Sequence, residues 1–142
     1  MIPDVGRSLR HPEMDPSMLI GVPSIDREHH ALVSQLNRLI DDARADTGSA
    51  AFSEVLSQLG RQINVHFDSE EDVLRSCGMP VDEVAEHIQA HNEIIDQYAT
   101  LNLDLMQGRQ ISRAGVLLMI KGWIVDHLLQ YDTKIRKYFP AA

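Results

Sequence analysis

Side chains that need a polar partner recur on the apolar faces of the predicted helices, and this feature restricts the fold most strongly. These residues lie three or four positions from aliphatic residues, so they share the inward helical faces. Seven side chains have this placement: His29, His66, Glu70, His87, His91, His127 and Asp132. Burying five imidazoles and two carboxylates separately would be costly, so we expect the fold to bring all seven to one point.

The composition bounds the class of protein. A chain of 142 residues, 44% of them apolar, suits one globular domain with its own core. The net charge of −8 makes nucleic acid and anionic membranes unsuitable partners. The longest apolar run, residues 116–120, is too short for membrane insertion. With one cysteine, no internal disulfide and no signal-peptide pattern, we expect a cytoplasmic location.

Apolar and histidine positions recur at three-four spacing in four segments, which predicts four amphipathic helices. The expected helices cover residues 24–45, 50–77, 82–106 and 112–138. Ser24 and Ser112 are expected as N-caps, and Gly78 and Gly108 as the residues that end helices. Because short connections make consecutive helices neighbours, we predict an all-α protein, an antiparallel up-down-up-down four-helix bundle over residues 24–139.

Residues 1–23 are expected to form an arm outside the bundle. They contain four of the six prolines, a spacing that excludes a long helix. We therefore predict an extended N-terminal arm on the surface of the bundle, with the side chain of His11 in solvent.

The spacing of the polar residues predicts how they converge. His66 and Glu70 are four residues apart and lie one turn above each other, whereas Glu71 is expected on the solvated surface. His127 and Asp132 are five apart, so on a regular helix they diverge by about 140°. Asp132 must then reach sideways across the core, which suits a carboxylate that bridges two metal ions.

Two other metal sites have partly similar patterns. His87 and His91 have the histidine spacing of zinc proteases, but Ile88 stands where those enzymes have their general base. The ferritin-like di-iron pattern requires Glu-x-x-His pairs, which this sequence lacks. A lone histidine on an apolar face is more often a hydrogen-bonded core residue than a ligand. Five histidines spread over all four helices favour a metal pair instead.

Four short motifs contain all seven side chains. They are Ile-Asp-Arg-Glu-His at 25–29, His-Phe-Asp-Ser-Glu-Glu at 66–71, His-x-x-x-His at 87–91, and Trp-Ile-Val-Asp-His-x4-Asp at 123–132. On these motifs the chain resembles the hemerythrin family, specifically the bacterial hemerythrin-like domain, over residues 21–138. Ile135 stands where many relatives have tyrosine, and the arm lacks an early tryptophan. We therefore expect the surroundings of the ligands and the packing of the arm to differ.

The resemblance implies a non-haem di-iron centre with an oxo or hydroxo bridge. The implied ligands are three histidines for one iron, two histidines for the other and two bridging carboxylates: His87, His91 and His127; His29 and His66; Glu70 and Asp132. Counted with the bridge, one iron has all its octahedral positions filled and the other has one position open for dioxygen. Manganese or zinc would also suit imidazole and carboxylate donors.

The same resemblance implies that five apolar side chains wall the oxygen site: Leu32, Phe67, Trp123, Ile124 and Leu128. We expect reversible binding of dioxygen, and of small anions such as azide, for oxygen storage, delivery or sensing. No acid–base residue beyond the ligands falls in this predicted pocket, so we do not expect an enzyme. Two alternatives stay open: an oxygen or redox sensor domain of a larger protein, with a downstream signalling or oxygen-consuming partner, and a di-iron enzyme of peroxide or nitric oxide chemistry.

Overall fold

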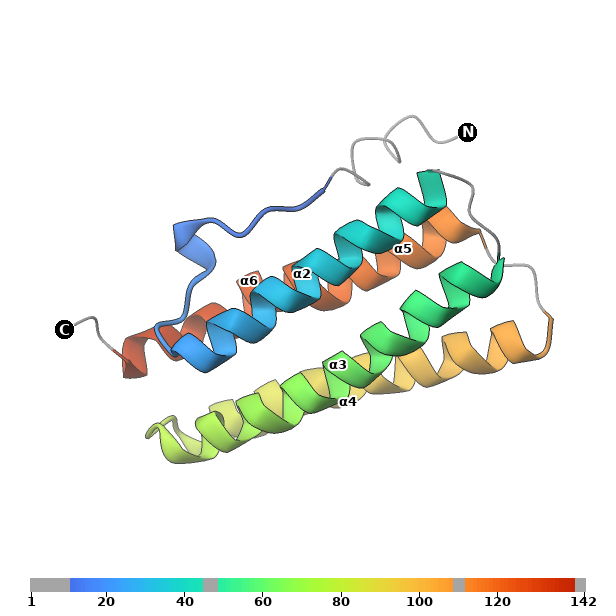
Figure 1. Cartoon of the computed structure of the whole chain (residues 1–142). Helices are drawn as coiled ribbons and strands as arrows, with labels where there is room; N and C mark the ends of the chain where they lie inside the picture. Colours follow the sequence, from blue (N-terminus) through green and yellow to red (C-terminus); the bar gives the residue numbers. More distant parts are fainter. Residues whose placement is uncertain (1–10, 45–48, 109–111, 140–142) are drawn as a thin grey trace.

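The computed structural model describes residues 11–44, 49–108 and 112–139, and in these residues there are helices but no strands (Figure 1). The helices form four columns of a bundle. The first three columns are single long helices: α2 (Pro23–Arg44), α3 (Ser49–Ser76) and α4 (Val81–Met106). The fourth column consists of α5 (Arg113–Lys121), η2 (Gly122–Asp126), α6 (His127–Gln130) and η3 (Asp132–Tyr138). Successive columns run in opposite directions, so the predicted all-α four-helix bundle is confirmed.

An arm precedes α2 and crosses the surface of the bundle. It contains one short 3-10 helix, η1 (Pro16–Met18). The side chain of Arg136 in η3 donates from Nε to the carbonyl oxygen of Leu19 at 2.7 Å. The side chain of His11 is exposed, as predicted, and its Nε2 lies 2.7 Å from Asp41 Oδ1. The prediction for residues before His11 lies outside the described residues.

Three of the four predicted helix boundaries are confirmed. Gly78 and Gly108 have φ angles of 89° and 74°, a backbone region that glycine enters without a steric penalty. Ser112 caps α5, since its side-chain oxygen accepts a backbone N–H at 3.3 Å. Ser24 is not the cap of α2, because this helix already begins at Pro23. Proline suits the first helical position, where its fixed φ is helical and no N–H is needed.

The fourth column is not the single regular helix that the sequence predicts. Residues Gly122–Asp126 form a π-helical turn, and the wider turn buries three consecutive residues, Trp123, Ile124 and Val125. The α-helix ends at Gln130, the φ and ψ of Tyr131 are −115° and −52°, and the chain continues as a 3-10 helix. A periodicity of 3.6 residues represents neither change, yet Trp123, Ile124 and His127, which it places inward, are all buried.

Gly60 in α3 makes room for Tyr98 of α4. A Cβ atom at position 60 would lie only 2.2 Å from the phenol of Tyr98. The hydroxyl of this tyrosine donates to the carbonyl oxygen of Leu56, also in α3, at 3.0 Å. The missing side chain therefore sets how closely α3 and α4 pack.

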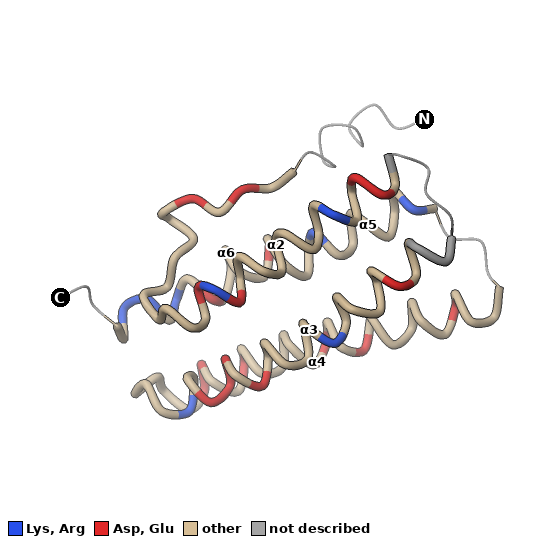
Figure 2. The backbone as a smooth tube through the Cα atoms, viewed as in Figure 1, with Lys and Arg blue, Asp and Glu red and all other residues tan. Residues whose placement is uncertain are grey.

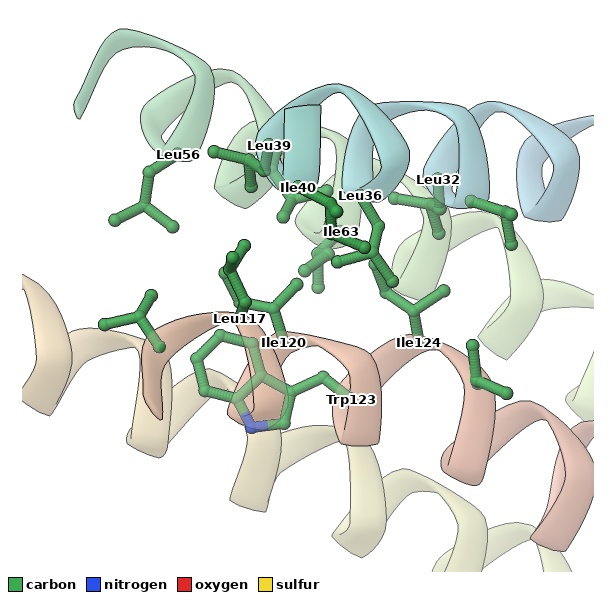
Figure 3. Close-up of a cluster of buried hydrophobic side chains, with 14 of the residues drawn as sticks. Leu32, Leu36, Leu39, Ile40, Leu56, Ile63, Leu117, Ile120, Trp123 and Ile124 are labelled. Atoms are coloured by element: carbon green, nitrogen blue, oxygen red, sulfur yellow. The ribbon is translucent and has the colours of Figure 1, made fainter. Parts of the chain in front are cut away.

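The buried apolar residues form two clusters, one on each side of the predicted polar residues. The larger cluster lies on one side of them and includes Leu32 and Trp123 (Figure 3). The smaller cluster includes Ile25 and Ile135. On α2, for example, His29 lies between Ile25 of the smaller cluster and Leu32 of the larger one. None of the helices in the described ranges is both long and apolar enough to cross a membrane.

Candidate metal centre

All four columns of the bundle contribute to one buried group of imidazoles and carboxylates. One residue comes from α2, two from α3, two from α4, and one each from α6 and η3: His29; His66 and Glu70; His87 and His91; His127; Asp132. Each of them has at most 6% of its surface exposed. The structure therefore brings together all seven side chains that the sequence identified.

The donor atoms fall into two overlapping groups, each with its atoms within 4.8 Å of one another. The three-histidine group contains three imidazoles and two carboxylates: His87, His91, His127, Glu70 and Asp132. The two-histidine group contains two imidazoles and the same two carboxylates: His29, His66, Glu70 and Asp132. The division of the histidines is the one that the resemblance implies, and both carboxylates are shared.

Glu70 directs a different oxygen to each group. Its Oε1 lies 2.9 Å from Nε2 of His87 and 3.0 Å from Nε2 of His91. Its Oε2 lies 3.3 Å from Nε2 of His29 and 3.2 Å from Nε2 of His66. The carboxylate thus stands between the groups with one oxygen toward each.

Asp132 has the same arrangement. Its Oδ1 lies 2.9 Å from Nε2 of His87 and 3.1 Å from Nε2 of His127. Its Oδ2 lies 3.1 Å from Nε2 of His29. On a regular helix Asp132 would diverge from His127, but the break at Tyr131 reorients the backbone between them. The sideways reach predicted from the sequence is achieved by this change of helix type.

Two further carboxylates lie behind the ring of histidines. Nδ1 of His66 is 2.8 Å from Glu28 Oε1, and Nδ1 of His91 is 3.0 Å from Glu71 Oε2. An ionised carboxylate can only accept, so each imidazole donates its Nδ1 proton outward. In the neutral ring Nε2 then has a lone pair directed at the centre, the arrangement typical of metal-binding histidines.

Glu28 and Glu71 were not among the predicted site residues, and the expectation that Glu71 is a solvated surface residue is wrong. Its side chain is 15% exposed and that of Glu28 is 31% exposed. Both stand inside the motifs, since Glu28 precedes His29 and Glu71 follows Glu70. In the sequence, only their position next to a predicted ligand indicated that these two residues belong to the site.

Aromatic rings brace the three-histidine group. The ring of Phe67 is stacked on His91, with centroids 3.8 Å apart and planes at 10°. Tyr131 is stacked on His127 with centroids 5.1 Å apart. In the two-histidine group, by contrast, Nδ1 of His29 is buried without a hydrogen-bond partner among the described residues.

The protonation of the centre reflects burial opposed by charge. Burial lowers the pKa of His29, but hydrogen bonds and charge from Asp132 and Glu70 outweigh it and raise this pKa to about 10. Burial also lowers the pKa of His87, but the same carboxylates outweigh it and raise this pKa to about 9. Burial would raise the pKa of both Glu70 and Asp132, yet the surrounding imidazoles hold the two pKa values below their usual range. Without metal, the imidazoles of His29 and His87 are therefore protonated near neutral pH, while Glu70 and Asp132 are ionised.

A small cavity of about 10 Å³ adjoins the centre, enough for one water-sized sphere. Its lining consists of polar and apolar residues: His29, Leu32, Ile63, His66, Phe67, Trp123, Ile124, His127 and Asp132. Four of the five predicted pocket residues are in this lining. Leu128 is buried in the same core but is not part of it, and Ile63 takes part although it was not predicted. Ile63 precedes His66 by three residues, which places it on the same face of α3.

Comparison with known proteins agrees with this geometry. The family described as "Hemerythrin HHE cation binding domain" matches residues 21–142. A bacteriohemerythrin of Stenotrophomonas maltophilia (strain R551-3) is 28% identical over 109 residues, which cover 77% of this chain and 69% of that protein. A bacteriohemerythrin of Campylobacter jejuni subsp. jejuni serotype O:23/36 (strain 81-176) is 26% identical over 115 residues, covering 81% and 85%. No solved structure gives a significant match. The chain belongs to the hemerythrin family.

Proposed function

We propose that the chain holds two iron ions in the two groups and binds dioxygen reversibly, for storage, delivery or sensing. The observation that carries this proposal is the division of each carboxylate between the groups. Glu70 and Asp132 each direct one oxygen to imidazoles of the three-histidine group and the other to the two-histidine group. A single ion would leave one oxygen of each carboxylate without a function.

The protonation of the histidines supports a cation in the centre. His66 and His91 donate outward from Nδ1, so in the neutral ring Nε2 has no proton to give to Glu70. A lone pair and a carboxylate oxygen 3.0 to 3.2 Å apart repel each other unless a positive charge lies near both. That charge is either a second proton on the ring or a metal ion, and iron suits imidazole with carboxylate.

The two-histidine group has one donor fewer than its neighbour, and both of its histidines line the cavity. Iron bound there would have a coordination position for dioxygen, and a pair of iron ions would supply the electrons for reversible binding. The residues of the chain provide the surroundings. Leu32, Phe67 and Ile124 form an apolar wall that excludes water from this position.

The cavity supports binding rather than turnover. The titratable residues in its lining are His29, His66, His127 and Asp132, all of which are proposed ligands. A general acid or base in the same space would favour peroxide or nitric oxide chemistry. A sensory role, with a signalling partner, remains compatible with the same binding step.

The test is anaerobic reconstitution with ferrous iron, followed by elemental analysis and cycles of oxygen and argon. We expect about two irons per chain and an absorption spectrum that appears with oxygen and disappears under argon. One iron per fully loaded chain would contradict the proposed centre. Oxidation that argon does not reverse would contradict oxygen binding and favour redox chemistry.

A further inference from the structure

A second hollow lies outside the cavity, between α2 and α3. It has a volume of about 290 Å³ and is lined by residues of these two helices: Glu28, Ala31, Leu32, Arg61, Gln62, Val65 and His66. Two of these residues, Leu32 and His66, also line the small inner cavity. One leucine and one imidazole therefore separate the α2–α3 pocket from the space beside the centre.

We propose that the α2–α3 pocket is the entrance through which dioxygen and small anions such as azide reach the centre, with the side chain of Leu32 as the gate. This inference rests on the proposed oxygen binding. The pocket leads to His66, a member of the two-histidine group, where the free coordination position is proposed. Ala31, Leu32 and Val65 give it an apolar surface, which suits an uncharged gas.

A competing route exists on the opposite side. A hollow of about 390 Å³, the α4–η2 pocket, shares Trp123 and His127 with the inner cavity. His127 belongs to the three-histidine group, which has no donor missing. The indole N–H of Trp123 donates to Gln97 Oε1 at 2.6 Å, so this ring is held in place as a wall. Leu32 is an aliphatic side chain that no hydrogen bond holds, and it can change rotamer.

The charges near the two pockets also favour the α2–α3 pocket as the route. The α4–η2 pocket is lined by Glu93 and Asp126, and α4 has acidic side chains along its length but no lysine or arginine (Figure 2). The α2–α3 pocket has one carboxylate, Glu28, which is engaged with His66, and one guanidinium, Arg61. Small anions such as azide are therefore repelled less at the α2–α3 pocket.

The experiment fills each pocket in turn in the full iron-loaded chain. Ala31→Phe adds a ring at the exposed wall of the α2–α3 pocket, and Met119→Phe replaces a flexible side chain by a ring at the exposed wall of the α4–η2 pocket. Both sites are on the surface, and thermal melting confirms folding. Stopped-flow mixing then measures the association rates of dioxygen with the reduced protein and of azide with the oxidised protein.

We expect Ala31→Phe to slow both associations about tenfold, the effect of an added barrier of about 1.4 kcal/mol, and Met119→Phe to leave them unchanged. Unchanged rates in Ala31→Phe, or slower rates in Met119→Phe alone, would overturn the proposed route. If the parent protein does not bind oxygen reversibly, the proposed function fails, while the azide rates still report the route.

Xenon locates the route without any reaction, because it occupies apolar cavities. Crystals of the iron-loaded parent protein under xenon pressure should show the gas in the α2–α3 pocket. Crystals of Ala31→Phe should lose that site and retain any other. Xenon found in the α4–η2 pocket and not between α2 and α3 would contradict the assignment.

Discussion

The two halves of the centre share their carboxylates but differ in how firmly their histidines are held. In the three-histidine group, His91 is fixed by Phe67 on one face and by Glu71 at Nδ1, and His127 is stacked on Tyr131. In the two-histidine group His66 has a carboxylate at Nδ1 but no stacked ring, and this group borders the cavity with both of its imidazoles. The difference indicates one half built to retain a cation and one half built to leave room beside it.

The largest effect is expected from changing a carboxylate that the two halves share. Glu70→Gln keeps the shape of the side chain but removes the charge that faces four imidazoles. We expect both ions to be lost, so that iron content falls from about two per chain to nearly none. Elemental analysis after reconstitution measures this. Retention of one ion would show that the halves are independent and that Glu70 does not bridge them.

The second test follows the stability of the metal-free protein with pH. The pKa values of His29 and His87 are raised to about 10 and about 9, so their contribution is complete below the unfolded pKa near 6.5. It is lost as the pH rises through 9 to 10. The lowered pKa values of Glu70 and Asp132 give a contribution that is lost as the pH falls below about 4.

The metal-free protein should therefore be most stable between about pH 4.5 and 6.5, from the unfolded pKa values of glutamate and histidine. Urea unfolding at a series of pH values measures this dependence. A stability that keeps rising from pH 6.5 to 9 would show that the imidazoles are neutral in the metal-free state.

The third test compares the outer carboxylates, one in each half. Glu28→Gln replaces the carboxylate behind His66 by a neutral amide, and Glu71→Gln does the same behind His91. Changes of this kind reduce metal affinity by about 10- to 100-fold. In each variant we expect the ion in the altered half to be bound more weakly. We expect the loss of affinity to be larger for Glu28→Gln, because no ring is stacked on the histidines of the two-histidine group. Competition with a chelator measures both affinities, and equal losses would remove this difference between the halves.

The smallest expected effect comes from one methyl group in the cavity wall. Ile63→Val and Ile120→Val both truncate buried isoleucines, but only Ile63 lines the cavity. Each should lower the free energy of unfolding by about 1 kcal/mol. Only Ile63→Val should shorten the lifetime of the oxygenated protein, because it admits more water. Equal lifetimes in the two variants would mean that the wall at Ile63 does not protect the bound oxygen.

The fold and the convergence of the seven side chains could be predicted because helical periodicity fixes which residues face inward. That periodicity assumes a constant turn, so it could not show the π turn before His127 or the break at Tyr131. Glu71 was misplaced because a charged residue on a helix surface is solvated unless a neighbouring helix brings it a partner, here His91. Whether Leu128 or Ile63 meets the cavity depends on side-chain packing in three dimensions, which spacing along one helix does not determine.

The contact of Asp132 with His29 joins the first and last columns of the bundle, since these residues stand near the start of α2 and at the start of η3. An ion held by both would act as a cross-link between distant points of the unfolded chain. In the chain-entropy treatment of cross-links, closing a loop of about 100 residues is worth about 4.7 kcal/mol. Fraying of the terminal column would then require release of the ion. The metal would thus make the first and last columns unfold together rather than separately.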